Sequence, residues 1–216
     1  MDGIGWNYSE KVKEHFFNPK NILTIPEEEY KADGIGYVGS PACGDMMKIY
    51  IKVKDNRIID LKWKTFGCAS AIGSTSMLSE MVTKNGGMTL EEAYKITPED
   101  IIKELGGLPA NKIHCSVLGD KALRDAINDY YKKTGQLDKI PKTEAKVVCE
   151  CLNVTDEDIR MEVLEGVKDF DTLQKRTKVA TGCGKCKDNV IKLLNDFVSQ
   201  YYSCDVYTGQ DSQEVR

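Results

Sequence analysis

Seven of the eight cysteines in this chain fall into two groups that follow different spacing rules. The first group is dispersed, and its cysteines have one acidic and one imidazole neighbour: Cys43, Asp45, Cys68, His114 and Cys115. The second is compact, a Cys-x-Cys pair followed after 31 residues by a Cys-x-x-Cys pair: Cys149, Cys151, Cys183 and Cys186. Thiolate, imidazole and carboxylate groups together bind zinc, iron or iron–sulfur clusters, so the fold must gather each group at one place.

Charge and hydropathy exclude several classes of function. A net charge of −4 and a pI near 5.4 argue against a nucleic-acid-binding protein, which carries a basic surface. No apolar stretch approaches the roughly 20 residues that cross a bilayer, and the N-terminus lacks the pattern of a secretory signal. We therefore expect a cytoplasmic protein without membrane contact, in which patterned cysteines serve metal or redox chemistry rather than disulfides.

The first part of the chain predicts one helix and a small sheet. An amphipathic helix is expected from about Tyr8 to Phe17. Residues 47–54 and 59–65 alternate apolar with polar side chains around a turn at Asp55-Asn56, which predicts an antiparallel hairpin. This alternation places Ile59 on the same face as Leu61 and Trp63. A third strand is expected near residues 35–39.

Helices are predicted for most of the remaining chain. They cover about residues 69–83, two short segments that start at Thr89 and Thr97, and about residues 116–133. The polar stretch 135–146 predicts a linker. Beyond it we expect helices that start at Thr155, near Asp171 and at about Lys187. The predicted organisation is a domain over 1–134, a linker over 135–146, a small domain over 147–202 and a flexible tail over 203–216.

The dispersed group predicts a labile metal site. An antiparallel hairpin brings its ends together, so the loops that carry Cys43 and Cys68 become neighbours, with Asp45 in reach. Cys115 lies just before a predicted helix, where free N–H groups and the helix dipole favour a thiolate. A carboxylate among thiolates is a harder and weaker ligand, which favours release of the bound species. We therefore expect the thiolate to be favoured most at Cys115, less at Cys68, which also precedes a predicted helix, and least at Cys43.

Four segments near these cysteines resemble a known family. They are residues 8–21, the Ala42-Cys43-Gly44-Asp45 motif, residues 66–72, and the Ile113-His114-Cys115-Ser116 motif. In these segments residues 8–134 resemble the iron–sulfur cluster scaffold domain of the IscU/NifU family. The resemblance implies an α+β fold, with a small antiparallel sheet packed on helices. It also implies transient [2Fe–2S] or [4Fe–4S] clusters on Cys43, Cys68 and Cys115, assisted by Asp45 or His114. Persulfide sulfur would come from a NifS- or IscS-type cysteine desulfurase, and we expect Cys115 to be the first sulfur acceptor, followed by Cys68 and then Cys43. Some members carry Leu-Pro-Pro-Val-Lys before the His-Cys pair as a chaperone-recognition motif, and this chain has Leu-Pro-Ala-Asn-Lys instead.

The compact group supplies four thiolates, the full set for a permanent [2Fe–2S] cluster or a structural zinc ion. Spacing alone does not separate these two. The Val148-Cys149-Glu150-Cys151 segment, the helix start at Thr155 and the Thr181–Cys186 segment resemble the small helical [2Fe–2S] domain of NifU and of bacterioferritin-associated ferredoxin. The resemblance implies a small all-helical [2Fe–2S] domain over residues 147–200.

We predict a scaffold for iron–sulfur cluster assembly rather than an enzyme. It would receive iron and sulfur, pass a labile cluster to apo iron–sulfur proteins, and use the second cluster for redox support. The expected assembly is a homodimer. Two alternatives remain open: a ferredoxin-like electron carrier, and a zinc-binding regulator of a cysteine desulfurase in which the dispersed group binds zinc.

Overall fold

Three antiparallel strands form the sheet on which the N-terminal part of the protein is built. In this computed structural model, residues 8–39, 45–141, 145–203 and 206–207 are described. Strands β1 (Gly34–Gly39), β2 (Met46–Lys54) and β3 (Arg57–Phe66) are ordered β1-β2-β3, which confirms the predicted hairpin and third strand. The turn between β2 and β3 is made by Asp55 and Asn56, which both have positive φ.

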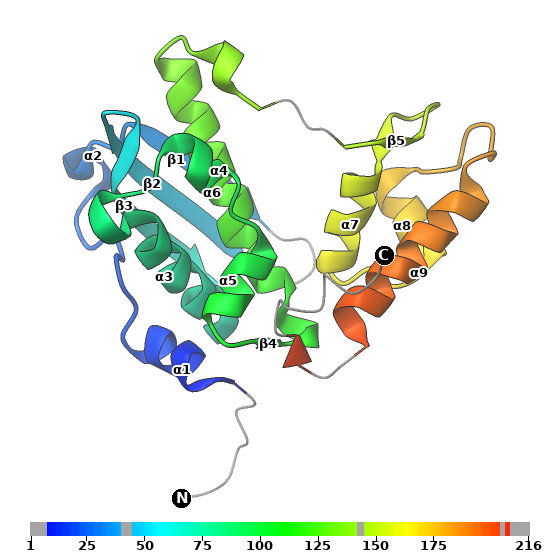
Figure 1. Cartoon of the computed structure of the whole chain (residues 1–216), viewed down its shortest axis with the longest axis horizontal. Coiled ribbons are helices and arrows are strands. Elements are labelled where there is room, and N and C mark those ends of the chain that lie inside the picture. Colours follow the sequence, from blue (N-terminus) through cyan, green and yellow to red (C-terminus); the bar gives the residue numbers. More distant parts are fainter. Residues whose placement is uncertain (1–7, 40–44, 142–144, 204–205, 208–216) are drawn as a thin grey trace, which may run out of the picture.

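Helices cover one face of this sheet. α6 (His114–Lys133) packs on β1 and β2, and α3 (Ala69–Thr83) packs on β3 and on α6. α6 approaches β1 closely because β1 carries glycines there: a Cβ on Gly36 would lie 1.9 Å from the carbonyl oxygen of Ala122. The helix α1 (Glu10–Phe17), predicted from the sequence, packs on α3 through Val12 and His15. The α+β architecture expected from the sequence is therefore present (Figure 1).

A β-bulge changes which side chain of β3 faces the core. Lys52 pairs with Asp60 but Val53 pairs with Ile58, so Ile59 is the extra residue in β3. Ile58 is consequently fully buried, whereas Ile59 is 49% exposed. The strict alternation that placed Ile59 on the buried face is wrong at this position, because an inserted residue inverts the faces beyond it.

Shorter elements connect the main ones. Capping boxes at Thr89 and Thr97 start two of the short helices, as the sequence predicts. These elements are α2 (Glu27–Tyr30), η1 (Lys84–Gly86), α4 (Leu90–Tyr94), α5 (Pro98–Glu104), β4 (Leu108–Pro109), η2 (Ala110–Lys112) and η3 (Leu137–Lys139). Among the described residues, no helix is both long and apolar enough to cross a membrane.

The C-terminal region, residues 145–203, is mostly helical. It contains α7 (Asp156–Leu164), α8 (Phe170–Thr177) and α9 (Lys187–Tyr202), together with a two-stranded pair of β5 (Val147–Cys149) and β6 (Val154–Thr155). Thr155 caps α7 with a capping box, as predicted. α8 begins after Asp169, whose side chain accepts the N–H of Thr172, so Asp169 rather than Asp171 is the cap.

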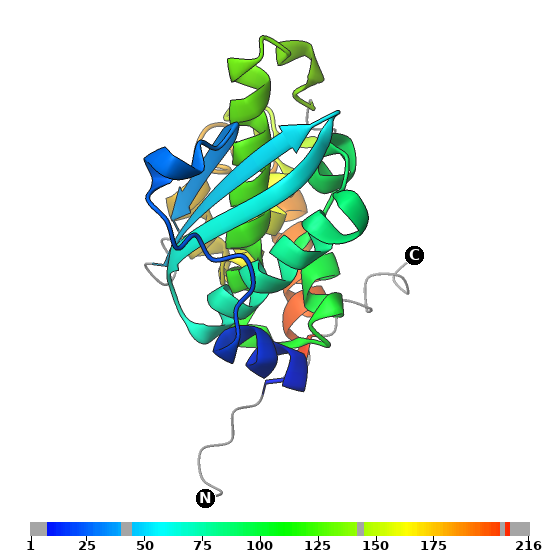
Figure 2. The same ribbon diagram turned by 90° about the vertical axis from the view of Figure 1, so that its left-hand side faces the viewer.

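The C-terminal region lies against α5, η2 and α6 of the N-terminal region. In Figure 2 the sheet lies in front, α6 passes behind it, and the C-terminal helices lie further back. Tyr201 on α9 is 1% exposed and belongs to the same hydrophobic cluster as the N-terminal core. β7 (Val206–Tyr207), within the stretch expected to be a flexible tail, pairs with β4. The two regions therefore share both apolar packing and backbone hydrogen bonds.

Candidate metal centres

The sheet and two helix N-termini bring three dispersed ligands together. Met46 pairs with Phe66 across β2 and β3, so the residues just outside this pair, Asp45 and Gly67, are neighbours. Cys68 is the N-cap of α3, and Cys115 lies in the first turn of α6, which packs on α3. One oxygen of Asp45 and the sulfurs of Cys68 and Cys115 lie within 4.8 Å of one another. We call these three residues the dispersed site.

The two thiols of the dispersed site are in direct contact. The sulfur atoms of Cys68 and Cys115 are 3.2 Å apart, and the backbone N–H of Cys68 donates to Oδ2 of Asp45 at 3.2 Å. The Cys115 thiol lowers the pKa of Cys68 to about 6, helped by backbone N–H groups of Ala71 and Ser70 at the start of α3 and opposed by burial. Cys115 is fully buried, whereas Cys68 is half-buried. At neutral pH the dispersed site therefore presents Cys68 as a thiolate.

His114 lies beside the dispersed site but is not part of this three-ligand group. We expected the helix to start after Cys115, but α6 begins at His114, because the turn of η2 leads directly into it. The Nε2 atom of His114 is buried without a hydrogen-bond partner in the described part of the chain. Burial lowers the pKa of His114, and Lys112 lowers it further. A neutral imidazole with an unpaired nitrogen keeps the ability to bind a metal.

Two further residues have side chains that can bind a metal, Cys43 and His15. Cys43 lies outside the described residues. His15 is 4% exposed, and its Nδ1 is 2.7 Å from the hydroxyl oxygen of Ser76. His15 therefore has a structural role, in which it links α1 to α3.

The four cysteines of the compact group, which we call the compact site, form two close pairs in the C-terminal region, Cys149 with Cys186 and Cys151 with Cys183. Cys149 is the last residue of β5, and Cys186 is the residue at the N-cap position of α9. The sulfurs of Cys151 and Cys183 are 3.4 Å apart. A backbone N–H of Ala180 is the main cause that lowers the pKa of Cys149, and a hydrogen bond from Cys186 adds to it. Cys151 and Cys183 are exposed to solvent. A donor set of four thiolates fits a [2Fe–2S] cluster or zinc, and it contains no weaker carboxylate ligand.

The loop before Cys183 contributes two features that the cysteine spacing does not reveal. A Cβ on Gly182 would lie 3.2 Å from the Cβ of Cys151, so a side chain there would require the two loops to move apart by a few tenths of an ångström. Ala180 has a φ of 59°, and this left-handed conformation directs its N–H toward Cys149. The signal for Gly182 was present in the sequence as a glycine next to a ligand, whereas nothing marked Ala180.

Comparisons with known proteins match both halves of the chain. Residues 7–137 match the family described as NifU-like N terminal domain, and residues 147–196 match the family described as BFD-like [2Fe-2S] binding domain. The iron-sulfur cluster assembly scaffold protein IscU 1 of Archaeoglobus fulgidus is 56% identical over 133 residues, which cover 62% of this chain and 82% of that protein. The nitrogen fixation protein NifU of Nostoc sp. is 39% identical over 198 residues, which cover 88% of this chain and 64% of that protein. A crystal structure of a NifU-like N-terminal protein from Brucella abortus covers 57% of this chain and 94% of its own, with 21% identity and a TM-score of 0.43.

These matches define the class of protein: a NifU-like N-terminal domain joined to a BFD-like [2Fe–2S] binding domain. The chain belongs to the NifU/IscU family of iron–sulfur cluster assembly scaffold proteins. It spans 64% of the length of the Nostoc NifU protein. The resemblance predicted from the sequence is therefore confirmed for both parts of the chain.

Proposed function

We propose that this protein assembles a labile iron–sulfur cluster at the dispersed site and transfers it to apo iron–sulfur proteins. The observation that carries the proposal is the convergence of Asp45, Cys68 and Cys115 within 4.8 Å from three separate elements. Cys43 would complete a three-thiolate set, and His114 would be an additional nitrogen ligand. Two donor types in one site support release, because the carboxylate is a poorer match than thiolate for iron in a sulfur-rich site.

Sulfur would arrive as the persulfide of a cysteine desulfurase. The Cys68 thiolate would attack the terminal sulfur of that persulfide, forming a new S–S bond at Cys68 while the desulfurase cysteine leaves as a thiolate. Cys68 suits this step better than Cys115, because it is more exposed and its pKa is lowered to about 6. This order differs from the expected ranking, in which Cys115 came first. Cys115, in contact with Cys68, would receive the sulfur next.

The compact site would hold a resident [2Fe–2S] cluster on Cys149, Cys151, Cys183 and Cys186. Such a cluster supplies one electron at a time, and reduction of persulfide sulfur to sulfide consumes electrons. The chain's own contribution is to fix the thiolates, with the Ala180 N–H directed at Cys149 and Gly182 allowing close approach of the loops. The protein would therefore act as an assembly carrier in the cytoplasm rather than as an enzyme, with a desulfurase, apo-proteins and a second copy of itself as partners.

A second candidate function is a zinc-dependent regulator of a desulfurase. Asp45, Cys68 and Cys115 with a fourth ligand also form a zinc-type donor set, which favours this reading. A pure electron carrier is less well supported, because the contact between Cys68 and Cys115 would then have no role.

Metal and sulfide analysis separates these functions. The protein is purified without oxygen and incubated with a cysteine desulfurase, cysteine and ferrous iron, and then iron, zinc and acid-labile sulfide are measured. The scaffold function predicts more iron and sulfide in the wild type than in Cys68→Ala or Cys115→Ala, with Cys204→Ala as the matched control that behaves like the wild type. Equal iron and sulfide in all four proteins would refute it. Zinc in the dispersed site that resists replacement would favour the regulator.

A further inference from the structure

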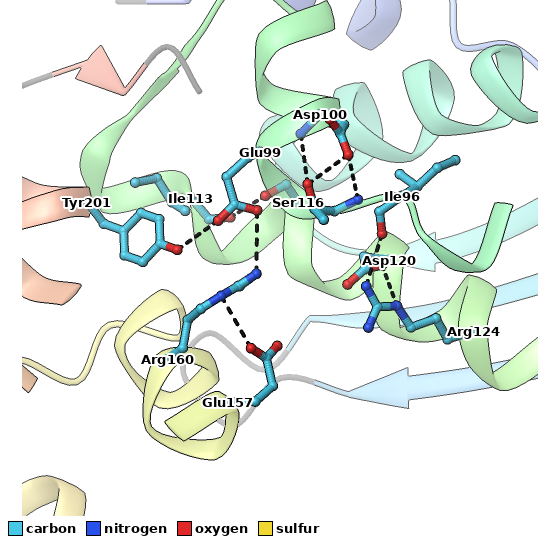
Figure 3. A network of polar contacts seen from close by, with 11 residues as sticks. Ile96, Glu99, Asp100, Ile113, Ser116, Asp120, Arg124, Glu157, Arg160 and Tyr201 are labelled. Carbon is cyan, nitrogen blue, oxygen red and sulfur yellow. Dashed lines mark hydrogen bonds and ion pairs between the residues drawn. The ribbon is translucent and has the colours of Figure 1, made fainter. Parts of the chain in front are cut away.

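The C-terminal region contacts the N-terminal region through a charged cluster at Glu99 on α5. Arg160 on α7 lies 3.6 Å from Glu99, and the hydroxyl of Tyr201 on α9 donates to the same carboxylate at 2.7 Å. Figure 3 shows Arg160 and Tyr201 approaching Glu99 from two helices of the C-terminal region. The side chains of Glu99 and Arg160 are only 15% and 18% exposed. We refer to Glu99, Arg160 and Tyr201 as the clasp.

Two further contacts join the same two regions. Lys121 on α6 pairs with Glu165, which follows α7. β7, after the end of α9, pairs with β4, which is followed by η2 and His114. The clasp, the Lys121–Glu165 pair and the β4–β7 ladder thus join the two regions near the start of α6.

A cleft of about 520 Å³ lies between the two regions, beside Glu165. Asn111 and His114 line it from the N-terminal region, and residues 165–169 with Tyr202 line it from the C-terminal region. The C-terminal region therefore covers the side of the dispersed site on which His114 lies. His114 is the neighbour of Cys115, so this cover stands over one approach to the labile metal centre.

The clasp is incompletely satisfied. Oε2 of Glu99 and Nη1 of Arg160 are buried without hydrogen-bond partners among the described residues. At 3.6 Å, the Glu99–Arg160 ion pair is longer than a hydrogen bond. A buried pair with unpaired donor and acceptor atoms recovers little of its desolvation cost, whereas removal of one partner leaves the other charge buried without its counter-charge and is strongly destabilising. Interfaces between domains of one chain are commonly polar and open reversibly.

We propose that the C-terminal region is a reversible cover over the His114 side of the dispersed site, held closed by the clasp. The closed state shields this side of the labile centre, and opening gives a partner protein access to His114 and the start of α6. The inference rests on the proposed function in one respect: a scaffold must admit a sulfur donor and an acceptor in turn, and a removable cover allows that.

The test measures the accessibility of His114 directly. Diethylpyrocarbonate modifies neutral imidazole, and the two histidines of the chain are quantified separately by mass spectrometry of their peptides. The full chain with its resident cluster, but without added iron or sulfur, is used. His15 is the internal control, because it is buried between α1 and α3 on the N-terminal region.

Loss of the clasp should open the cover. We expect Arg160→Gln and Glu99→Gln each to raise the modification rate of His114 about tenfold, while the rate at His15 stays unchanged. The double variant should exceed neither single variant by more than about twofold, because both changes break one interaction. The milder Tyr201→Phe removes only the hydroxyl and should raise the rate by a smaller factor. X-ray scattering should show a larger radius of gyration in the same variants.

Lys133→Gln is the matched control, since Lys133 pairs with Asp129 within α6, 2.7 Å away. It should leave both histidines at the wild-type rate. Unchanged modification of His114 in Arg160→Gln, Glu99→Gln and Tyr201→Phe would overturn the cover. An equal rise at His15 would show general unfolding and would also overturn it. Neither result bears on cluster assembly at the dispersed site, which iron and sulfide analysis measures independently.

Discussion

The surroundings of Cys68 favour its thiolate form in the dispersed site. Its neighbour Cys115 donates to it, and the start of α3 supplies backbone N–H groups. Asp45 acts in two ways: it accepts the N–H of Cys68, and its charge raises the pKa of the Cys68 thiol. Cys115 and the backbone N–H groups lower the pKa of Cys68, whereas the charge of Asp45 raises it, so the reactivity of the Cys68 sulfur depends on all of these neighbours.

Replacement of Cys115 should therefore be felt at Cys68. In Cys115→Ala we expect the pH midpoint for alkylation of Cys68 to rise from about 6 toward the usual value near 8.5, because the main hydrogen bond to the thiolate is lost. In Asp45→Asn the midpoint should fall, because the negative charge is removed while the acceptor for the N–H stays. The measurement is the rate of iodoacetamide labelling of Cys68 against pH in metal-free protein. A midpoint that is the same in all three proteins would contradict this account.

Asp45 should also limit the lifetime of the labile cluster. We expect Asp45→Ala to lengthen the half-life of cluster transfer to an apo-ferredoxin several-fold, because a hard ligand that favours exchange is removed. The time course is followed by the absorbance of the acceptor. Transfer as fast as in the wild type, or faster, would reduce Asp45 to a turn residue that orients the Cys68 N–H.

At the scale of the elements, the approach of α6 to β1 depends on a strand glycine. In Gly36→Ala, the new methyl group would collide with the backbone of α6, with Ala122 O at 1.9 Å and Ala126 N at 2.5 Å. We expect a loss of about 3 kcal/mol or more in stability, since backbone has to move. Gly39→Ala is the matched control in the same strand, because its Cβ would meet nothing closer than 3.9 Å. Thermal melting followed by circular dichroism compares the two variants, and equal melting temperatures would refute the close contact.

The buried Asp120 on α6 should make stability depend on pH. Burial raises its pKa to about 7, although Arg124, 3.0 Å away, and Arg160 act against the rise. Because the pKa is raised on folding, stability is greatest when Asp120 is protonated and falls as pH rises toward 7. Between pH 5.5 and 7.5 the wild type should therefore lose about 2 kcal/mol that Asp120→Asn does not lose. Melting temperatures of both proteins across this range test the expectation, and parallel curves would contradict it.

The elements were largely predictable because their signals are local. Alternation gave the hairpin, and Thr-x-x-acid patterns gave the starts of α4, α5 and α7. The errors arose where tertiary geometry decides. The bulge at Ile59 follows from pairing between strands, and the start of α6 at His114 follows from η2 leading into the helix.

The candidate sites divide in the same way. Spacing identified the cysteines, but it gave neither the contact between Cys68 and Cys115 nor the lowered pKa of Cys68 and the difference in exposure of the two side chains. The clasp at Glu99 was invisible in the sequence. Its three side chains come from α5, α7 and α9 and meet only when the two regions dock.

At the scale of the whole molecule, the two metal centres should be independent in stability. The compact site has four thiolates of its own in the C-terminal region, so we expect the Cys43→Ala, Cys68→Ala, Cys115→Ala triple variant to keep a red-brown colour and a stable [2Fe–2S] absorption spectrum. Cys149→Ala is the comparison that should lose this spectrum. A folded but colourless triple variant would contradict the independence of the two metal centres.

Helix α9 begins directly after Cys186 of the compact site and ends at Tyr202, in the cleft beside His114. Its 16 residues span roughly 24 Å at 1.5 Å per residue. Electron tunnelling weakens exponentially with separation, so a path along the full length of α9 would be a slow one. An electron held at the exposed sulfurs of Cys151 and Cys183 is better placed to leave toward another molecule than to travel the length of its own helix. If the resident cluster proposed above supplies electrons to the dispersed site, we therefore expect them to pass through a second copy, a separate carrier or the opened form of the chain rather than along α9.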